Sequence, residues 1–465
     1  MDLLSDLNEA QRKAVTHTGS PLLIVAGAGT GKTTVVTRRF AWLVAQNLAA
    51  QDHILTLTFT EKAASEMEER IDQLVPLSSG ERWVMTFHAF CERVLRVHAL
   101  DVGLPGDFKI LDTTGQWLLM RRNLDKFSLD YYKPLGNPSK FINVLLDHFS
   151  RAKDEGITPE AYMVYVQAQQ LNTDSADLTE VSEVARYAEI AHAYHLYQQI
   201  KLDQGLFDFG DLMLYTYELF QKRPAVLTAW RNQFPYIMVD EFQDTNFVQY
   251  QVMKLLGHPS NNITVVGDDE QSIYAFRGAS MSNILHFKDE HPTATSVVLT
   301  ENYRSLQGIL DKAYSFIQAN NPNRLEYTLK IPKKLKATRE GSAVIKHLHA
   351  LSLAEETQLI ADTILKLRRS DPTLAFRDIA VLARANSHIE GLLPTLDRAE
   401  IPYQFLASSG LYAKPVILDV VAYLKLLDNY HESAALYRVL TMPFLGMPYE
   451  DIALLMHYAK RKGIS

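Results

Sequence analysis

The stretch LLIVAGAGTGKTT, residues 22–34, decides the fold class of this chain. An apolar run leads directly into a loop with glycines at positions 27, 29 and 31, and the loop ends in Lys32 and Thr33. We interpret Gly27 to Thr33 as the phosphate-binding pattern G-x-x-x-x-G-K-[ST]. Glycines let backbone N–H groups curve around phosphates, and the start of the next helix adds its positive dipole end. The stretch therefore predicts a strand, a phosphate loop and a helix that begins near Lys32.

The residue types in this loop predict how a nucleotide is held. Lys32 is expected to reach the β- and γ-phosphates, and the hydroxyl of Thr33 is expected to bind Mg²⁺. The residues expected around the phosphates are Ala28, Gly29, Thr30, Gly31, Lys32, Thr33 and Thr34. The alternative is a glycine-rich turn with a surface lysine, which the strand before the loop disfavours.

A second stretch, IMVDEFQDT at residues 237–245, supplies the carboxylates that such a loop needs. Its apolar strand ends in Asp240 and Glu241. We expect Asp240 to hold the metal through water and Glu241 to polarise the attacking water. The alternative is an acidic pair that caps the next helix. Two matching halves of one site favour Mg²⁺-dependent nucleotide hydrolysis.

Length and composition indicate a folded intracellular protein. The 465 residues correspond to about three domains, and 47% are hydrophobic and 22% charged. A single cysteine, Cys91, excludes an internal disulfide, and no apolar run reaches the roughly 18 to 20 residues of a membrane span. We expect a cytoplasmic protein without membrane association. The net charge of −7 does not exclude a nucleic-acid partner, because a narrow channel needs only local basic groups.

The order of patterns predicts parallel sheets with helices on both faces. Strands are expected in HILTLTF, WVMTFHAF, YIMVDEFQ, NITVVGDD and SVVLTENYRS, and again after residue 340 in SAVIKHLHA and DIAVLARAN. In EKAASEMEERI, Ala64, Met67 and Ile71 have helical spacing. The segment from about 93 to 220 lacks clear buried strands and is interpreted as a mostly helical insertion.

The stretch VVGDDEQSIYAFRGA, residues 265–279, indicates what the hydrolysis drives. A second acidic strand end lies next to Gln271, and Tyr274, Phe276 and Arg277 follow. Aromatic rings beside an arginine suit stacking on bases and contact with phosphates. The alternative is that Tyr274 and Phe276 are core residues.

Taken together, these motifs resemble the UvrD, PcrA and Rep group of superfamily 1 DNA helicases. In order, LNEAQRKAV resembles their Q motif, AGAGTGKT motif I, LTFTEKAASEMEER motif Ia, TFHAF motif Ib, VDEFQDTN motif II, VVGDDEQSIYAFRGA motif III and LTENYRS motif IV. The resemblance implies ATP as the nucleotide, Mg²⁺ as the metal, and single-stranded DNA and duplex junctions as partners. The resemblance is also compatible with repair or replication proteins as partners.

The resemblance implies further site residues. Gln11 resembles the residue that hydrogen-bonds adenine, and Tyr303 resembles the ring that stacks on it. Gln271 resembles the group that links the γ-phosphate to the DNA groove, and Arg304 resembles a transition-state arginine. The positions that resemble the lining of the single-strand path are Phe59, Thr60, Thr86, His88, Tyr274, Phe276 and Arg277. For Phe59 and His88, a structural role in the core is the open alternative.

The family architecture implies two RecA-like P-loop NTPase domains of the α/β class, with ATP between them. We expect residues 1–92 and 221–306 to form the first ATPase domain and 93–220 its helical insertion. Residues 307–410 are expected to start the second RecA-like domain, and 411–465 a second helical insertion. Closing and reopening around ATP is expected to move the protein 3′ to 5′ along single-stranded DNA.

The family's motifs V and VI do not occur within these residues. We therefore expect an N-terminal part of a helicase that binds ATP and hydrolyses it poorly, because transition-state arginines contribute rate factors of about 10³ to 10⁵. Two alternatives stay open. One is a non-motor switch module that binds ATP and DNA, and the other is the helicase subunit of a helicase-nuclease.

Overall fold

The computed structural model describes residues 2–75, 80–172, 177–258, 262–273, 282–406, 415–428 and 433–462. The chain divides into two compact units, residues 1–345 and 346–465. The strands, all in the first unit, are β1 Leu22–Ala26, β2 Ile54–Thr58, β3 Trp83–Thr86, β4 Lys109–Ile110, β5 Leu206–Phe207, β6 Tyr236–Val239, β7 Ile263–Gly267, β8 Thr295–Leu299, β9 Glu301–Asn302 and β10 Lys336–Ala337.

Six of these strands form one parallel sheet in the order β3-β2-β6-β7-β1-β8. β1 lies between β7 and β8, with Leu22 opposite Thr264 on one side and Thr295 on the other. β2 lies between β3 and β6. The strands predicted from the apolar runs before residue 306 are thus confirmed, and so is the α/β class with a parallel sheet.

Alternate residues of each strand enter different cores on the two faces of the sheet, because successive side chains of a strand point to opposite faces. In β1, Leu22, Ile24 and Ala26 pack with helices α1 to α3. Leu23 and Val25 pack into a second cluster, which includes residues of α4, α9, α11 and α12. A strand covered on both faces is mostly apolar, which is why these strands read as nearly continuous apolar runs with a few buried threonines such as Thr56 and Thr264.

The helices of the first unit follow the sheet strands or make up the segment before β6. They are α1 Glu9–Val15, α2 Lys32–Ala45, α3 Glu61–Leu74, α4 Phe87–His98, α5 Thr113–Arg122, α6 Ile142–Asp154, α7 Pro159–Asn172, α8 Leu178–Asp203, α9 Phe209–Lys222, α10 Pro224–Gln233, α11 Phe247–Gly257, α12 Ser282–Glu290, α13 Gln307–Ile317 and α14 Leu325–Thr328. Two expectations are confirmed. α2 begins at Lys32, and Ala64, Met67 and Ile71 are the buried side chains of α3.

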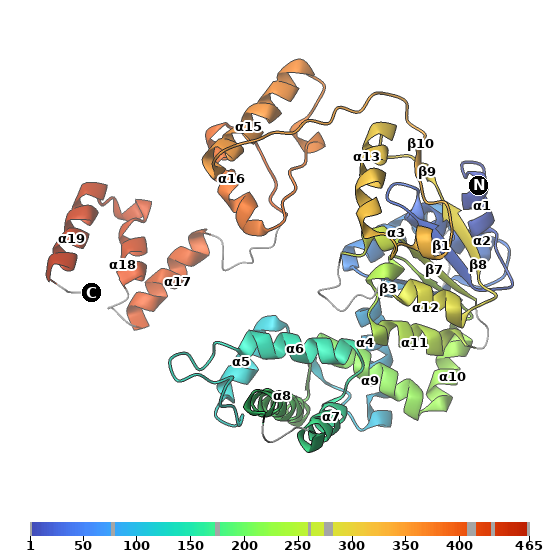
Figure 1. The fold of residues 1–465 in the computed structure, drawn as a ribbon, viewed down its shortest axis with the longest axis horizontal. Coiled ribbons are helices and arrows are strands. Elements are labelled where there is room, and N and C mark those ends of the chain that lie inside the picture. The colour runs from blue at the N-terminus through green and yellow to red at the C-terminus, as the bar shows by residue number, and fades with distance from the viewer. Residues whose placement is uncertain are drawn as a thin grey trace. The chain divides into compact units, whose positions relative to one another are not determined.

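Helices α5 to α8 form a group with its own hydrophobic core (Figure 1). Beneath this core Lys153 and Lys201 pair with Asp208 and Asp211, so two positive and two negative charges balance in a buried cluster. α6 also reaches the sheet domain, because Asn246 Nδ2 at the start of α11 donates to Asp154 Oδ1 over 2.8 Å. The helical character predicted for residues 93–220 is confirmed.

The second unit contains helices among its described residues: α15 Leu353–Ser370, α16 Asn386–Arg398, α17 Pro415–Asp428, α18 Ser433–Leu440 and α19 Tyr449–Lys462. The strands predicted in SAVIKHLHA (342–350) and DIAVLARAN (378–386) are wrong for this structure, since neither segment contains strand residues. Within the described residues neither segment pairs with another strand. An apolar pattern makes a strand only where a partner takes its backbone hydrogen bonds.

Within the described ranges, no helix is long and apolar enough to cross a membrane.

Candidate active site

The parallel sheet gathers the sequence motifs at one edge. The carboxyl ends of β1, β2, β3, β6 and β7 point the same way, since neighbouring strands are parallel. The glycine loop follows β1, the acidic pair follows β6, and the turn that contains Gln271 follows β7. This edge is where open α/β sheets bind ligands.

The glycine loop has the backbone conformation that its glycines allow. Gly29 and Gly31 have φ values of 75° and 86°, which side chains disfavour. A Cβ on Gly29 would lie 2.8 Å from both Asn302 Nδ2 and Arg304 Cβ. The strict loop pattern starts five positions before Gly31, where this chain has Ala26, so our sequence match from Gly27 was one position short. Ala26 is the buried last residue of β1, where a small side chain suffices.

Lys32 lies at the centre of the site. Its Nζ is 2.6 Å from Glu241 Oε2 and 3.2 Å from Gln271 Oε1. The Lys32 side chain is 10% exposed and that of Glu241 34%. Residues from three different loops therefore meet at one ammonium group, although more than 200 positions separate Lys32 from each partner in the chain.

The acidic pair is held in an unusual backbone conformation. Glu241 has φ 50° and ψ 45°, a left-handed conformation that costs about 1–3 kcal/mol for a residue with a side chain and is typical of functional sites. Glu241 Oε2 also accepts from Gln243 Nε2 over 2.7 Å. The Asp240 carboxyl is buried and accepts from the Glu241 backbone N–H over 2.9 Å. The turn thus aims two adjacent carboxylates in fixed directions.

The carboxylates of this site are short of positive charge. Burial, followed by the charge of Glu241, raises the pKa of Asp240 to about 6. Burial and Glu241 also raise the pKa of Asp244 to about 6, and the buried Asp244 Oδ1 has no hydrogen-bond partner among the described residues. The carboxyls of Asp240, Glu241 and Asp244 thus share the charge of Lys32. Among the described residues no group of three or more His, Cys, Asp or Glu side chains is placed to hold a metal ion. Mg²⁺ at nucleotide sites takes only one or two carboxylates and completes its coordination with phosphate oxygens and water.

Gln11 and Tyr303 both form hydrogen bonds with the glycine loop. Gln11 Nε2 donates to the Thr30 carbonyl over 2.9 Å, and its Oε1 accepts from the Asn8 backbone N–H. Tyr303 is 43% exposed, and its backbone N–H donates to the Gly29 carbonyl over 2.9 Å. Its hydroxyl donates to Glu301 and accepts from Asn8 Nδ2. Both residues therefore contact the loop and its surroundings, with the Tyr303 ring accessible for stacking.

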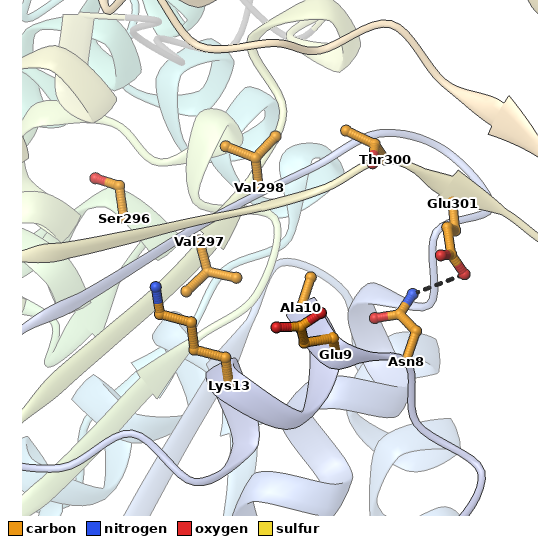
Figure 2. Close-up of a pocket in the computed structure, with 9 residues that line it drawn as sticks. All are labelled: Asn8, Glu9, Ala10, Lys13, Ser296, Val297, Val298, Thr300 and Glu301. Carbon is orange, nitrogen blue, oxygen red and sulfur yellow. Dashed lines mark hydrogen bonds between the residues drawn. The ribbon is translucent and has the colours of Figure 1, made fainter.

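A cavity of about 380 Å³ adjoins these residues (Figure 2). It is lined by Asn8, Glu9, Ala10, Lys13, Ser296, Val297, Val298, Thr300 and Glu301. The hydrogen bond from Asn8 Nδ2 to Glu301 Oε2, 3.1 Å long, is drawn at one side in Figure 2. Lys32, Glu241 and Gln271 do not line this cavity, so it is not where the phosphates are expected.

Four of the predicted DNA-contacting residues lie at the carboxyl ends of the neighbouring strands β2 and β3, Phe59 and Thr60 after β2 and Thr86 and His88 at the junction of β3 and α4. Thr60 is exposed and caps α3, whereas Phe59 and His88 are half-buried. Thr86 caps α4 and donates to Glu61 Oε1 over 2.7 Å. Burial lowers the pKa of His88 despite the opposing charge of Glu61, and its ring lies edge-on to Phe209. Tyr274, Phe276 and Arg277 lie outside the described residues.

Two buried amides, on Gln243 and Asn302, connect the motifs, although no sequence pattern pointed to them. Gln243 donates to Glu241 and accepts from the Asp268 backbone N–H over 3.0 Å, so it joins the loops after β6 and β7. Asn302 donates to the Ala28 carbonyl over 2.6 Å and accepts from the backbone N–H of Arg304, whose side chain is exposed. Both lie within motifs that we had identified, beside residues with obvious chemistry.

Comparison with known proteins gives two family matches that together span most of the chain. Residues 7–292 match the UvrD/REP helicase N-terminal domain, and residues 297–465 match the UvrD-like helicase C-terminal domain. Similar relatives include the ATP-dependent DNA helicase PcrA of Leuconostoc citreum, which is 37% identical over 467 residues. The proteins of the same name from Staphylococcus aureus (strain Mu50) and Staphylococcus epidermidis (strain RP62A) are 34% and 33% identical. The matches cover 100% of this chain but only 58% to 59% of these relatives.

Proposed function

The chain belongs to the UvrD/REP helicase family, and from that premise we propose that it couples Mg²⁺-dependent ATP hydrolysis to movement along single-stranded DNA. The direction of movement that we propose is 3′ to 5′. Duplex junctions are the proposed place of action, with repair or replication proteins as partners in the cytoplasm. We also propose the domain boundaries that the family architecture implies, with residues 1–92 and 221–306 as the first ATPase domain, 93–220 as its helical insertion, 307–410 as the start of the second RecA-like domain and 411–465 as a second insertion.

The residues around Lys32 are suited to a magnesium-bound triphosphate. The backbone N–H groups of residues 28–34 would hold the phosphates, and Thr33 and Asp240 would hold Mg²⁺. When bound, Mg²⁺ neutralises charge on the phosphate that is transferred. Glu241, fixed by Gln243 Nε2 and by its own backbone conformation, would take a proton from the attacking water. Arg304 would add positive charge in the transition state.

The ion pair between Lys32 and Glu241 suggests how the site responds to its substrate. Two of the three ammonium N–H groups of Lys32 are engaged in this structure, because both Glu241 and Gln271 accept from Lys32 Nζ. Binding a triphosphate would draw Lys32 away from Glu241 and release that carboxylate for the water. The contact between Lys32 and Gln271 would then depend on whether the γ-phosphate is present. Gln271 is therefore the proposed link between the γ-phosphate and the DNA path. Gln11 and Tyr303 would hold the adenine.

The observation that carries this proposal is the meeting of Lys32, Glu241 and Gln271, at 2.6 and 3.2 Å, from the ends of three parallel strands. The test is single-turnover ATP hydrolysis with and without single-stranded DNA. We expect a slow basal rate that DNA increases. ATP binding with no hydrolysis under either condition would instead favour the switch module, and no ATP binding would contradict the proposal.

A further inference from the structure

A lysine outside all the recognised motifs lies beside the active site. Lys333 follows α14, in a stretch of the chain without helix or strand, and its side chain is 3% exposed. Its Nζ lies 2.6 Å from Asp268 Oδ1, contacts Asp269 and lies 3.3 Å from Glu270. Burial lowers the pKa of Lys333, but Asp268 and Asp269 outweigh it, so the net pKa is raised and the ammonium stays charged.

Asp268 connects this lysine to the catalytic centre. One of its carboxylate oxygens, Oδ1, accepts from Lys333, and the other, Oδ2, accepts from Gln271 Nε2 over 2.7 Å. Gln271 Oε1 in turn accepts from Lys32 Nζ over 3.2 Å. The contacts therefore run without a gap from Lys333 through Asp268 and Gln271 to Lys32.

The two carboxylate oxygens of Asp268 have different partners, so Lys333 can orient this carboxylate as well as neutralise it. With Oδ1 held by Lys333, the carboxylate plane is fixed and Oδ2 faces the Gln271 amide. That contact orients the amide so that its nitrogen faces Asp268 and its oxygen faces Lys32. Glu270 has a further cation, because Arg324 Nε donates to it over 3.0 Å. The backbone N–H of Glu270 also donates to Asp268 Oδ1, over 3.2 Å, so Lys333 is the side-chain cation that holds this oxygen beside one backbone donor.

We propose that Lys333 is a positioning residue, which fixes Asp268 and thereby holds Gln271 in register with Lys32. The inference rests on the proposed function, since it assigns Lys333 to the coupling of that same site. Among the described residues, the hydrogen bonds and ion pairs of Lys333 reach neither the nucleotide loop nor the acidic pair, so nucleotide affinity should not depend on it.

The test is a double-mutant cycle between Lys333 and Gln271 in the full chain. ATP turnover and the affinity for a fluorescent ATP analogue are measured, with and without oligo-deoxythymidine, for Lys333→Met, Gln271→Ala and both together. Lys334→Met is the matched control, because Lys334 is 61% exposed and its nearest carboxylate, on Asp311, is 3.5 Å away. Lys333→Arg tests whether a cation alone restores turnover.

We expect Lys333→Met to lower turnover on the order of tenfold, as outer-sphere partners of an active site commonly do, with analogue affinity changed less than about twofold. The double variant should be no slower than Gln271→Ala, since both changes break one chain of contacts. Lys334→Met should match the wild type, and Lys333→Arg should recover most of the turnover.

Two results would overturn the inference: normal turnover in Lys333→Met, or a double variant whose loss is the product of the two single losses. If Lys333→Met fails to fold, Lys333→Met with Asp269→Asn removes one charge of each sign and is compared with Asp269→Asn alone. A wild-type chain that binds and hydrolyses ATP keeps the proposed function whatever Lys333 does. A wild-type chain that binds no ATP contradicts the proposed function itself.

Discussion

Replacing Glu241 by glutamine should raise the affinity for ATP and lower the rate of its hydrolysis. In the structure Lys32 Nζ lies 2.6 Å from Glu241 Oε2, so a triphosphate must compete with this carboxylate for the lysine. Glu241→Gln keeps an oxygen at that place but removes its charge. Lys32 is then easier to draw onto the phosphates.

The size of the effect follows from the environment of the pair. Two unit charges about 4 Å apart interact by about 4 kcal/mol at an effective dielectric constant near 20. The Glu241 side chain is 34% exposed and the pair also costs desolvation, so a net contribution of about 1–2 kcal/mol remains. The affinity for a non-hydrolysable ATP analogue should therefore rise about 5- to 30-fold. Hydrolysis should fall by about 10² to 10⁴, the usual contribution of a general base.

Isothermal titration with the analogue and Mg²⁺ measures the affinity, and single-turnover hydrolysis measures the chemical step. Glu218→Gln is the matched control, because Glu218 pairs with Lys222 over the same 2.6 Å on α9. It should change neither quantity. An analogue affinity of Glu241→Gln that equals or falls below that of the wild type would refute the competition between Glu241 and phosphate.

Two other changes test the phosphate loop, and a third tests a partly buried carboxyl group on α6. Lys32→Ala should abolish most ATP binding or turnover, measured by the same titration and assay, and unchanged values would count against the phosphate loop. Gly29→Ala should weaken ATP binding, because its new Cβ would lie 2.8 Å from Asn302 and Arg304, whereas Gly19→Ala, with φ 87° and no atom within 4 Å, tests backbone strain alone. Burial, followed by the charges of Glu155 and Asp208, raises the pKa of Asp154 to about 7. Between about pH 4 and pH 7 the native state therefore holds a proton that the unfolded state has released. The free energy of unfolding consequently falls as the pH rises through this range. Asp154→Asn should therefore raise the free energy of unfolding at pH 8 by about 1–2 kcal/mol after allowance for partial exposure, and by little near pH 4; equal gains at both pH values in urea unfolding would disprove the role of this charge.

The elements that the sequence predicted well are those in which local pattern and tertiary environment agree. Every residue of β1 and β7 is buried, so the apolar runs in the sequence were sufficient to predict both strands. Lys32, Asp240 and Glu241 were predictable because parallel strands must place their carboxyl ends at one edge. The left-handed backbone of Glu241 was not predictable, since nothing in the letters DEFQD demands it.

The failures have physical causes as well. The stretches 342–350 and 378–386 contain apolar residues but no strand partner among the described residues, and the partner is what makes a strand. Three polar residues that the sequence did not single out contact residues far away in the chain. Gln243 contacts Asp268 across 25 positions, Lys333 contacts Asp268 across 65, and Asn302 contacts Ala28 across 274. A polar residue in a single sequence carries no sign of such a partner.

The most direct measurement of the central claim is a crystal structure of this chain with Mg²⁺ and a non-hydrolysable ATP analogue. We expect the phosphates within the loop of residues 28–34, Mg²⁺ between Thr33 and Asp240, and Lys32 Nζ on the phosphates rather than on Glu241. An analogue bound elsewhere, or Lys32 still paired with Glu241 beside a filled loop, would contradict the account.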